Sequence, residues 1–349
     1  MLINRRTLLA AWAASLAPPT GLRAADVMPI ADMHAHLFFI GPNPAARQPL
    51  GRNMESGGAT LVSWSLVGDM PWIRRSTAGL KQAGTPKRGA ATAWFQEELE
   101  RIHRHLSDQK LKVVLTPDDI ERALAGEPHV VLSVEGATFL DDGLAGLEAA
   151  YTGGVRHLQL VHFARNAIGD FQTEAPAHGG LTAFGRDVIR EANRLGILID
   201  LAHATRSAVE QALEVSRAPM VWSHSSISRG EPSWRMPAWR ARQISLEEAR
   251  AIAAKEGVVG LWALSSDVGS TVGSYADRLL QMAQLLGDDH VAFGTDMNSI
   301  TNSPIKSYAD LRRAVAYMEA RGVEPSRLRK ISIGNYARVL RAAMVARKS

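Results

Sequence analysis

Five side chains that are able to bind a metal ion stand at the ends of apolar, strand-like runs in this sequence. Such runs need no histidine or glutamate for their own burial, so these residues are candidates for chemistry. Imidazole and carboxylate groups are the ordinary ligands of hydrolytic zinc, and this set suffices for two adjacent ions. The candidate ligands are His34, His36, Glu135, His203 and His224.

The first two candidates, His34 and His36, lie two residues apart in one strand-like run. Alternate residues of a strand point to the same face, so both imidazoles would enter the interior of a barrel. A second His-x-His sequence, His103 and His105, lies in a Glu/Arg-rich helical pattern over residues 96–106. Residues two apart diverge on a helix, so we expect the second pair to be solvated and outside the site.

Glu135 ends the run Val130-Val131-Leu132-Ser133-Val134, which would bury its carboxylate. A buried carboxylate requires a charged partner or a metal. One carboxylate that bridges two cations brings them within ~4 Å, the spacing at which they activate a shared hydroxide. The sequence leaves open a structural ion pair with a core arginine.

His203 and His224 end two successive strand-like runs. A single histidine at such a place would ordinarily be a satisfied core residue, but two in succession favour metal binding. Asp200, beside His203, would orient a ligand or cap its strand. Asp296 ends the last strand-like run and is a candidate acid/base or ligand, with a turn cap made with Asn298 as the alternative.

Eight strand-like segments alternate with helical patterns. Most are apolar runs without strict polar alternation, as expected for strands buried on both faces. Strands are expected at residues 27–37, 58–68, 129–137, 155–162, 197–204, 219–226, 257–264 and 290–297, and helices at 184–195, 207–215 and 245–255. The pattern predicts an α/β fold, a (β/α)8 TIM-like barrel whose active site uses the carboxyl ends of the strands.

Two stretches exceed a minimal barrel. Residues 64–94 hold three tryptophans and a Gly/Thr/Pro/Lys break at 84–89, which predicts a long loop or a helical insertion. Residues 229–242 are rich in Pro, Trp and Arg, which predicts a surface loop over one barrel end. No repeat or linker interrupts the chain, so we expect one hydrolase barrel domain over residues 26–349.

The first 25 residues are typical of an export signal peptide. Arg5 and Arg6 precede two leucines and an Ala/Leu-rich run, and Ala24 and Ala25 offer a cleavage site. Paired arginines followed by leucines resemble a twin-arginine signal, which predicts a periplasmic or secreted protein. The run is too short to span a bilayer, so no stable membrane anchor is expected. An ordinary amphipathic N-terminal helix is the alternative.

Composition narrows the function classes. The 349 residues are 46% hydrophobic, which is ample for a large core. The formal net charge is +5, but the sequence has no run of basic residues with aromatic residues between them. Nucleic acid is therefore not an expected partner. The chain has no cysteine, which excludes disulfides, thiolate metal sites and a cysteine nucleophile. A small-molecule substrate is the expected partner, and a homodimer is left open.

The chain resembles the membrane (renal-type) dipeptidase family, binuclear zinc peptidases related to the amidohydrolases. The resemblance covers nearly everything after the leader, and it rests on the order and spacing of short motifs. These are Asp32-Met33-His34, Val134-Glu135-Gly136, Gly154-Val155-Arg156-His157-Leu158 with His162 and Asn166, Gly180-Leu181-Thr182-Ala183-Phe184-Gly185-Arg186, Asn193-Arg194-Leu195-Gly196, Asp200-Leu201-Ala202-His203, Ser223-His224-Ser225-Ser226, Gly294-Thr295-Asp296 and Ile333-Gly334-Asn335-Tyr336.

The resemblance implies a role for each matching residue. It places a ligand of the first metal at His34 and the bridging carboxylate at Glu135. The two histidines of the second metal fall on His203 and His224. The family's histidine that contacts substrate and steadies the tetrahedral intermediate falls on His162.

The resemblance also implies the groups that bind the ends of the substrate. The acid/base aspartate near the substrate amine falls on Asp296. The arginine for the substrate carboxylate falls on Arg242, with Arg235 and Arg240 as alternatives because the preceding loop is longer in this chain.

The chain departs from the family pattern at two places. His34-Ala35-His36 stands where the family usually has His-x-Asp, which removes one negative charge and resembles the wider amidohydrolase group. We expect metal binding to survive and metal preference to shift. Asp296-Met297-Asn298-Ser299 stands where the family has Asp-Phe-Asp-Gly, which alters the floor of the substrate pocket.

Together the residues and the resemblance predict an exported zinc-dependent hydrolase that cleaves small dipeptides with a metal-bridging hydroxide. Asp296 would carry the proton to the leaving amine, and His162 would stabilise the oxyanion. Arg242 would favour substrates with a free carboxylate. Two alternatives stay open: an amidohydrolase for another small amide, N-acyl amino acid or lactone, and a non-catalytic periplasmic binding protein.

Overall fold

The computed structural model describes residues 28–36, 49–77 and 79–347. The predicted export signal over residues 1–25 and the cleavage site at Ala24 and Ala25 lie outside the described residues.

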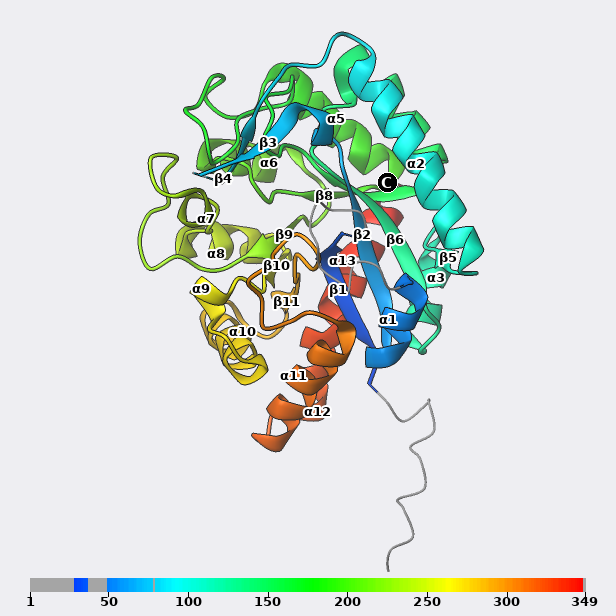
Figure 1. Cartoon of the computed structure of the whole chain (residues 1–349), viewed down its shortest axis with the longest axis vertical. Coiled ribbons are helices and arrows are strands. Elements are labelled where there is room, and N and C mark those ends of the chain that lie inside the picture. Colours follow the sequence, from blue (N-terminus) through cyan, green and yellow to red (C-terminus); the bar gives the residue numbers. More distant parts are fainter. Residues whose placement is uncertain (1–27, 37–48, 78, 348–349) are drawn as a thin grey trace, which may run out of the picture.

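Eight parallel strands form the centre of the molecule, in the order β1-β2-β6-β7-β8-β9-β10-β11 (Figure 1). Each lies within one of the eight predicted segments and is buried along its whole length, which explains why the sequence shows apolar runs rather than alternation. The strands are β1 (Ile30–Ala35), β2 (Ala59–Val67), β6 (His129–Glu135), β7 (Val155–Gln159), β8 (Leu198–Asp200), β9 (Val221–Ser225), β10 (Val258–Leu261) and β11 (Val291–Phe293), and the short β5 (Lys112–Val113) pairs with β6 off this path.

The sheet closes into a barrel between its last and first strands. Ala35 forms a parallel bridge with Met297, just beyond β11. The backbone N–H of Asp296 donates to the carbonyl of His34 at 3.0 Å. The N–H of His36 donates to the carbonyl of Met297 at 2.9 Å. The predicted (β/α)8 TIM-like fold is confirmed.

Helices surround this barrel (Figure 1). The three predicted helices correspond to α5, α6 and α8, and α8 begins with a capping box between Ser245 and Glu248. The helices are α1 (Leu50–Gly57), α2 (Ala90–Asp108), α3 (Pro117–Leu124), α4 (Ala145–Thr152), α5 (Ala183–Leu195), α6 (Arg206–Val215), α7 (Ala238–Ala241), α8 (Leu246–Ala254), α9 (Ser265–Val268), α10 (Val272–Leu286), α11 (Tyr308–Ala320), α12 (Pro325–Arg329) and α13 (Asn335–Ala346).

The C-terminal helix α13 closes the amino end of the barrel. Residues from the first halves of the strands, such as Leu61 and Val131, form one buried cluster with Tyr336 and Leu340 of α13. This packing fills the barrel at one end with apolar side chains. The polar side chains that end the strands are therefore gathered at the opposite, carboxyl end, where barrel enzymes carry their active sites.

The expectation for residues 64–94 is partly wrong. Trp64 lies inside β2, and an antiparallel hairpin of β3 (Ile73–Ser76) and β4 (Gly79–Gln82) follows before α2 begins at Ala90. The hairpin strands have four residues each and mostly exposed or half-exposed side chains, so they carry no apolar signal in the sequence. Residues 229–242 lie at the surface as predicted, with α7 as their one regular element.

Candidate metal centre

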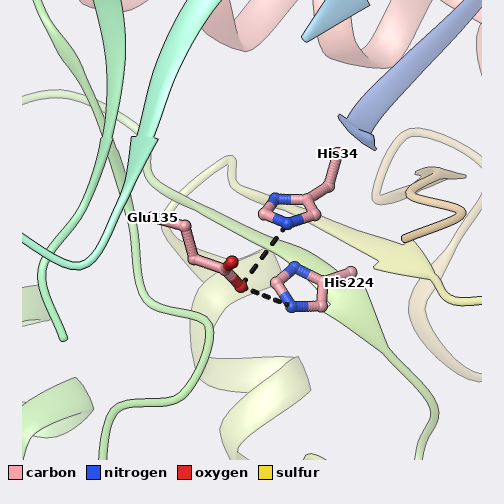
Figure 2. Close-up of side chains that lie close together, drawn as sticks. All are labelled: His34, Glu135 and His224. Carbon is pink, nitrogen blue, oxygen red and sulfur yellow. Dashed lines mark ion pairs between the residues drawn. The ribbon is translucent and has the colours of Figure 1, made fainter. Parts of the chain in front are cut away.

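The five predicted metal ligands converge at the carboxyl ends of the barrel strands. In Figure 2 the rings of His34 and His224 face the carboxylate of Glu135 from β1 and β9. Side chains from four strand ends thus meet at one carboxylate, although they are up to 190 positions apart in the chain. Three histidines direct Nε2 toward Oε1 of Glu135, at 3.5 Å for His34, 3.3 Å for His203 and 3.4 Å for His224. Nε2 of His36 lies 3.4 Å from the other oxygen, Oε2.

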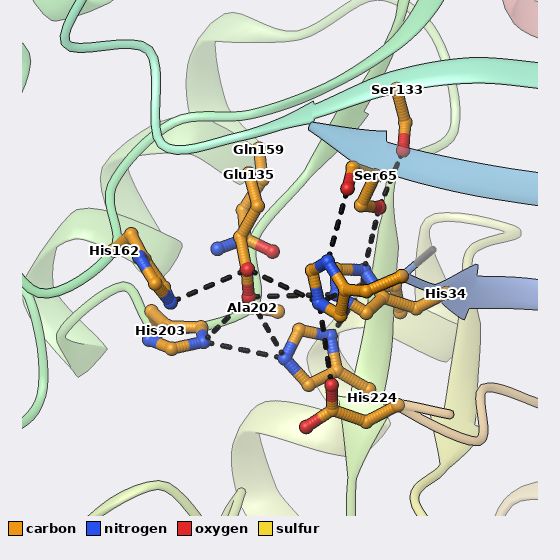
Figure 3. Close-up of polar contacts among 12 residues, drawn as sticks. His34, Ser65, Ser133, Glu135, Gln159, His162, Ala202, His203 and His224 are labelled. Carbon is orange, nitrogen blue, oxygen red and sulfur yellow. Dashed lines mark hydrogen bonds and ion pairs between the residues drawn. The ribbon is translucent and has the colours of Figure 1, made fainter. Parts of the chain in front are cut away.

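The imidazole nitrogens form two pairs around this carboxylate. The Nε2 atoms of His34 and His36 lie 3.0 Å apart. Those of His203 and His224 lie 3.3 Å apart (Figure 3). Each of these five side chains belongs to a residue at most 2% exposed. Nitrogen and oxygen atoms that are so crowded and so buried favour a cation among them. The arrangement fits a pair of divalent metal ions.

The protonation of the site also suits metal binding. Burial lowers the pKa of His34, and it lowers those of His203 and His224 well below the usual range. His36 is the exception: burial alone would lower its pKa, but Asp296 and Glu135 outweigh burial and raise it. Burial alone would raise the pKa of Glu135, but the nearby imidazoles, His162 and His34 first, outweigh burial and hold that pKa well below its usual range. Neutral imidazoles offer lone pairs and an ionised carboxylate offers charge, which is what a divalent cation requires.

Hydroxyl and carbonyl groups behind the histidines fix the orientation of the rings. Nδ1 of His36 donates to the carbonyl oxygen of Ser65 at 3.0 Å, and the Ser65 hydroxyl lies 3.2 Å from Nδ1 of His34. The Ser223 hydroxyl lies 2.7 Å from Nδ1 of His224. Such contacts hold Nε2 toward the ligand site. Sequence reasoning missed Ser65 and Ser223, because a serine in a strand carries no distinctive pattern.

Asp200 orients the strand ends rather than entering the site. One of its oxygens accepts from the backbone N–H of Ala202 at 2.9 Å and of Ser223 at 3.0 Å. Its other oxygen lies 3.4 Å from Nε2 of His157. The carboxylate thereby ties the segment that leads to His203 to the start of the segment that carries His224.

His162 faces the same carboxylate from a fifth strand end. Its Nε2 lies 3.3 Å from Oε2 of Glu135, and its Nδ1 lies 2.7 Å from a carboxylate oxygen of Asp69. The other oxygen of Asp69 accepts from the backbone N–H groups of Phe163 and Ala164 at 3.0 and 2.8 Å. Asp69 therefore holds both the ring and its backbone. Asp69 was not predicted, although the sequence places this acid directly after a buried strand.

A glycine allows His162 to approach so closely. Gly136 has a φ of +85°, and a Cβ at this position would lie 2.9 Å from the Cβ of His162. A side chain there would be strained by the backbone and would push the histidine away from Glu135.

Asp296 lies on the His36 side of the site. Its Oδ1 lies 3.4 Å from Nε2 of His36, and its backbone has a φ of +54°, a strained value for a residue other than glycine. Burial alone would raise the pKa of Asp296, but His36 outweighs burial and lowers it. The side chain of Asn298 donates to the carbonyl of His36 at 2.5 Å, which links the segment after β11 to the end of β1.

Arg242 enters the site beside His224. Its Nη2 lies 2.6 Å from Nε2 of His224, and its guanidinium lies 5.6 and 5.3 Å from the ring centroids of Phe163 and Trp262. Of the three candidate arginines, the structure brings only this one among the histidines. Arg235 and Arg240 are exposed, and each packs over the tryptophan that precedes it.

Comparison with known proteins identifies the family. The model of the membrane dipeptidase family, peptidase family M19, matches residues 54–349. The chain belongs to the membrane dipeptidase family. The match includes Glu135, His203 and His224 and begins after His34 and His36. The family predicted from the short motifs is thus confirmed.

Two curated relatives are dipeptidases by name. Dipeptidase tcpJ of Claviceps purpurea is 30% identical over 253 residues, which cover 70% of this chain and 57% of that protein. Dipeptidase aclJ of Aspergillus oryzae is 27% identical over 227 residues, which cover 62% and 51%. The chain therefore spans little more than half the length of these relatives.

A solved metallopeptidase structure shares the fold. The crystal structure of a metallopeptidase from Rhodobacter sphaeroides, which holds a phosphinate mimic of the dipeptide L-Ala-D-Ala, superposes with a TM-score of 0.74 at 22% identity. The match covers 91% of this chain and 100% of that chain.

Proposed function

We propose that this member of the membrane dipeptidase family hydrolyses the amide bond of small dipeptides and uses two zinc ions. The observation that carries the proposal is the convergence of four imidazoles on the two oxygens of Glu135. His34 and His36 would hold one ion, His203 and His224 the other, and Glu135 both. Zinc bound there would supply a Lewis acid for the substrate carbonyl and an activated water at neutral pH.

Two buried side chains are placed to handle charge and protons. Asp296 is ionised at neutral pH by virtue of its lowered pKa, so it can bind the ammonium of a dipeptide and then hold the proton that the leaving amine needs. His162 directs Nε2 into the site with its Nδ1 fixed by Asp69, so it can donate a hydrogen bond to the developing oxyanion. These roles follow the family resemblance and agree with the geometry.

Arg242 supplies the third recognition element. Among the described residues, no carboxylate lies within 4.0 Å of its guanidinium, and its buried Nε has no hydrogen-bond partner. A half-buried guanidinium in this condition is incompletely solvated, and a carboxylate would satisfy it bidentately. Arg242 lies beside His224 and Asp296 beside His36, so the two residues could bind the carboxylate and the ammonium of a dipeptide.

A panel of substrates tests the proposed reaction. The zinc-loaded protein would be offered free dipeptides, N-acyl amino acids and lactones, and hydrolysis would be followed by release of product. We expect turnover of dipeptides to exceed that of the other classes. Preferential hydrolysis of acyl amino acids or lactones would show a different amidohydrolase, and zinc binding without turnover of any class would show a binding protein.

Arg242→Ala is expected to change specificity. It should raise the KM for free dipeptides roughly 10- to 100-fold, the value of a charged hydrogen bond, and raise it much less for dipeptide amides. Arg240→Ala is the matched control, because it removes the same charge from an exposed neighbour. Steady-state kinetics on acid and amide pairs provide the measurement. Equal losses on both members of each pair would assign the carboxylate contact to another group.

We further propose that residues 1–25 are an export signal and that the barrel domain spans residues 26–349. Within the described residues no helix is both long enough and apolar enough to cross a membrane. Arg5 and Arg6 support the twin-arginine route, which carries folded protein and suits an enzyme that loads metal first.

The double variant Arg5→Lys/Arg6→Lys should leave the precursor in the cytoplasm, whereas the unaltered chain should be found in the periplasm with an N-terminus near Asp26. Fractionation and N-terminal sequencing provide the measurement. Continued export of the double variant would point to the general secretory route.

A further inference from the structure

We propose that Arg242 couples the two binding events of this site, so that a carboxylate ligand tightens the retention of the metal held by His203 and His224. The inference rests on the proposed function for the identity of the metal and of the carboxylate. It goes beyond carboxylate recognition, because it assigns to Arg242 an effect on metal affinity.

The coupling depends on the lone pair on Nε2 of His224. Guanidinium nitrogens donate hydrogen bonds and do not accept them, so the 2.6 Å contact from Nη2 of Arg242 engages the lone pair on Nε2 of His224. The proton of this ring then lies on Nδ1, which is 2.7 Å from the Ser223 hydroxyl. Nε2 is also the atom that faces Glu135 at 3.4 Å. A metal ion and Arg242 therefore compete for the same lone pair.

Besides His224, the Arg242 guanidinium makes few polar contacts. Within the described residues its Nε lacks a hydrogen-bond partner, and its guanidinium has no carboxylate within 4.0 Å. The rings of Phe163 and Trp262 confine the cation beside His224. At this range a positive guanidinium also repels a divalent cation in a poorly hydrated site. Both effects weaken metal binding at this pair of histidines.

His34 and His36 have a different charge beside them. Oδ1 of Asp296 lies 3.4 Å from Nε2 of His36, so a negative charge stands where the second pair has a positive one. The two metal sites are therefore unequal, and the site at His203 and His224 is the weaker.

A carboxylate ligand raises the metal affinity of the site at His203 and His224. When it binds the guanidinium, it neutralises the charge and offers Arg242 a better acceptor than an imidazole nitrogen, which frees the lone pair of His224. Coupling between two ligands is reciprocal, so a substrate or product carboxylate tightens the second metal and that metal tightens the carboxylate. The weaker metal site is thus strengthened when the enzyme holds a substrate.

Zinc retention tests the competition directly. The zinc-loaded full chain would be titrated with a chromophoric chelator, and the dissociation constants of the two ions would be compared among the unaltered chain, Arg242→Ala and Arg240→Ala. We expect Arg242→Ala to bind its weaker zinc at least about tenfold more tightly, with no change in Arg240→Ala. Equal zinc affinity in the two variants would overturn the proposal.

A second arm tests the coupling. Acetate should tighten the weaker zinc of the unaltered chain and of Arg240→Ala, and acetamide should not. In Arg242→Ala the acetate effect should disappear. An acetate effect that persists in Arg242→Ala would show direct binding of acetate to zinc and would contradict the coupling. These readouts count zinc rather than turnover, so they are independent of whether the chain hydrolyses dipeptides.

Discussion

Glu135→Gln is expected to remove most of the bound zinc from both positions and, with it, the activity. All four histidines lie within 3.5 Å of an oxygen of Glu135, so in the proposed arrangement this one group would serve both ions. Glutamine keeps the shape but replaces the negative charge and one oxygen by a neutral amide whose N–H groups repel cations. Metal analysis of the purified variant, after zinc loading and desalting, provides the measurement.

The matched control is Glu248→Gln. Glu248 is also a buried glutamate, but it caps helix α8 and makes no contact with the histidines. This variant should keep the zinc content of the unaltered chain. Full zinc occupancy in Glu135→Gln would show that Glu135 does not bridge the two ions.

Asp296→Asn is expected to keep zinc and lose turnover. The carboxylate is 2% exposed and lies beside His36 rather than between the two histidine pairs, so the amide can take its place without removing a bridging ligand. A carboxylate positioned for proton transfer contributes about 10²–10⁴ in rate. We therefore expect kcat on a free dipeptide to fall by that factor while the zinc content per chain stays unchanged.

Asp310→Asn provides the control for this variant, because Asp310 is a buried aspartate that caps helix α11. It should leave kcat within a small factor of the unaltered value. A kcat of Asp296→Asn equally close to the unaltered value would remove Asp296 from the mechanism, and loss of zinc would make Asp296 a ligand instead.

The barrel and the position of its site could be predicted from the sequence because the strands are buried on both faces. A histidine or glutamate that ends such a run is conspicuous, as Glu135 is after the run that begins at His129. The motifs around His203 and His224 carried the same signal. The β3–β4 hairpin carried none, since its short strands are polar and exposed.

The contacts among the groups that support the ligands could not be predicted in the same way. Asp69 and His162 are 93 positions apart, and their contact depends on how two different strands end. The family resemblance favoured Arg242 but left Arg235 and Arg240 as alternatives, because the local sequence does not show which arginine enters the site. The position of Arg242 depends on the turn of α7 and on the Ser225 hydroxyl, which donates to the carbonyl of Arg242 at 2.9 Å.

Diffraction from crystals of the zinc-loaded protein at the zinc absorption edge would show directly whether two zinc ions share one carboxylate. We expect two anomalous peaks within ~4 Å of each other, with Glu135 between them. One peak should lie against His34 and His36, and the other against His203 and His224. A single peak, or a pair of peaks away from Glu135, would rule out a zinc pair bridged by Glu135.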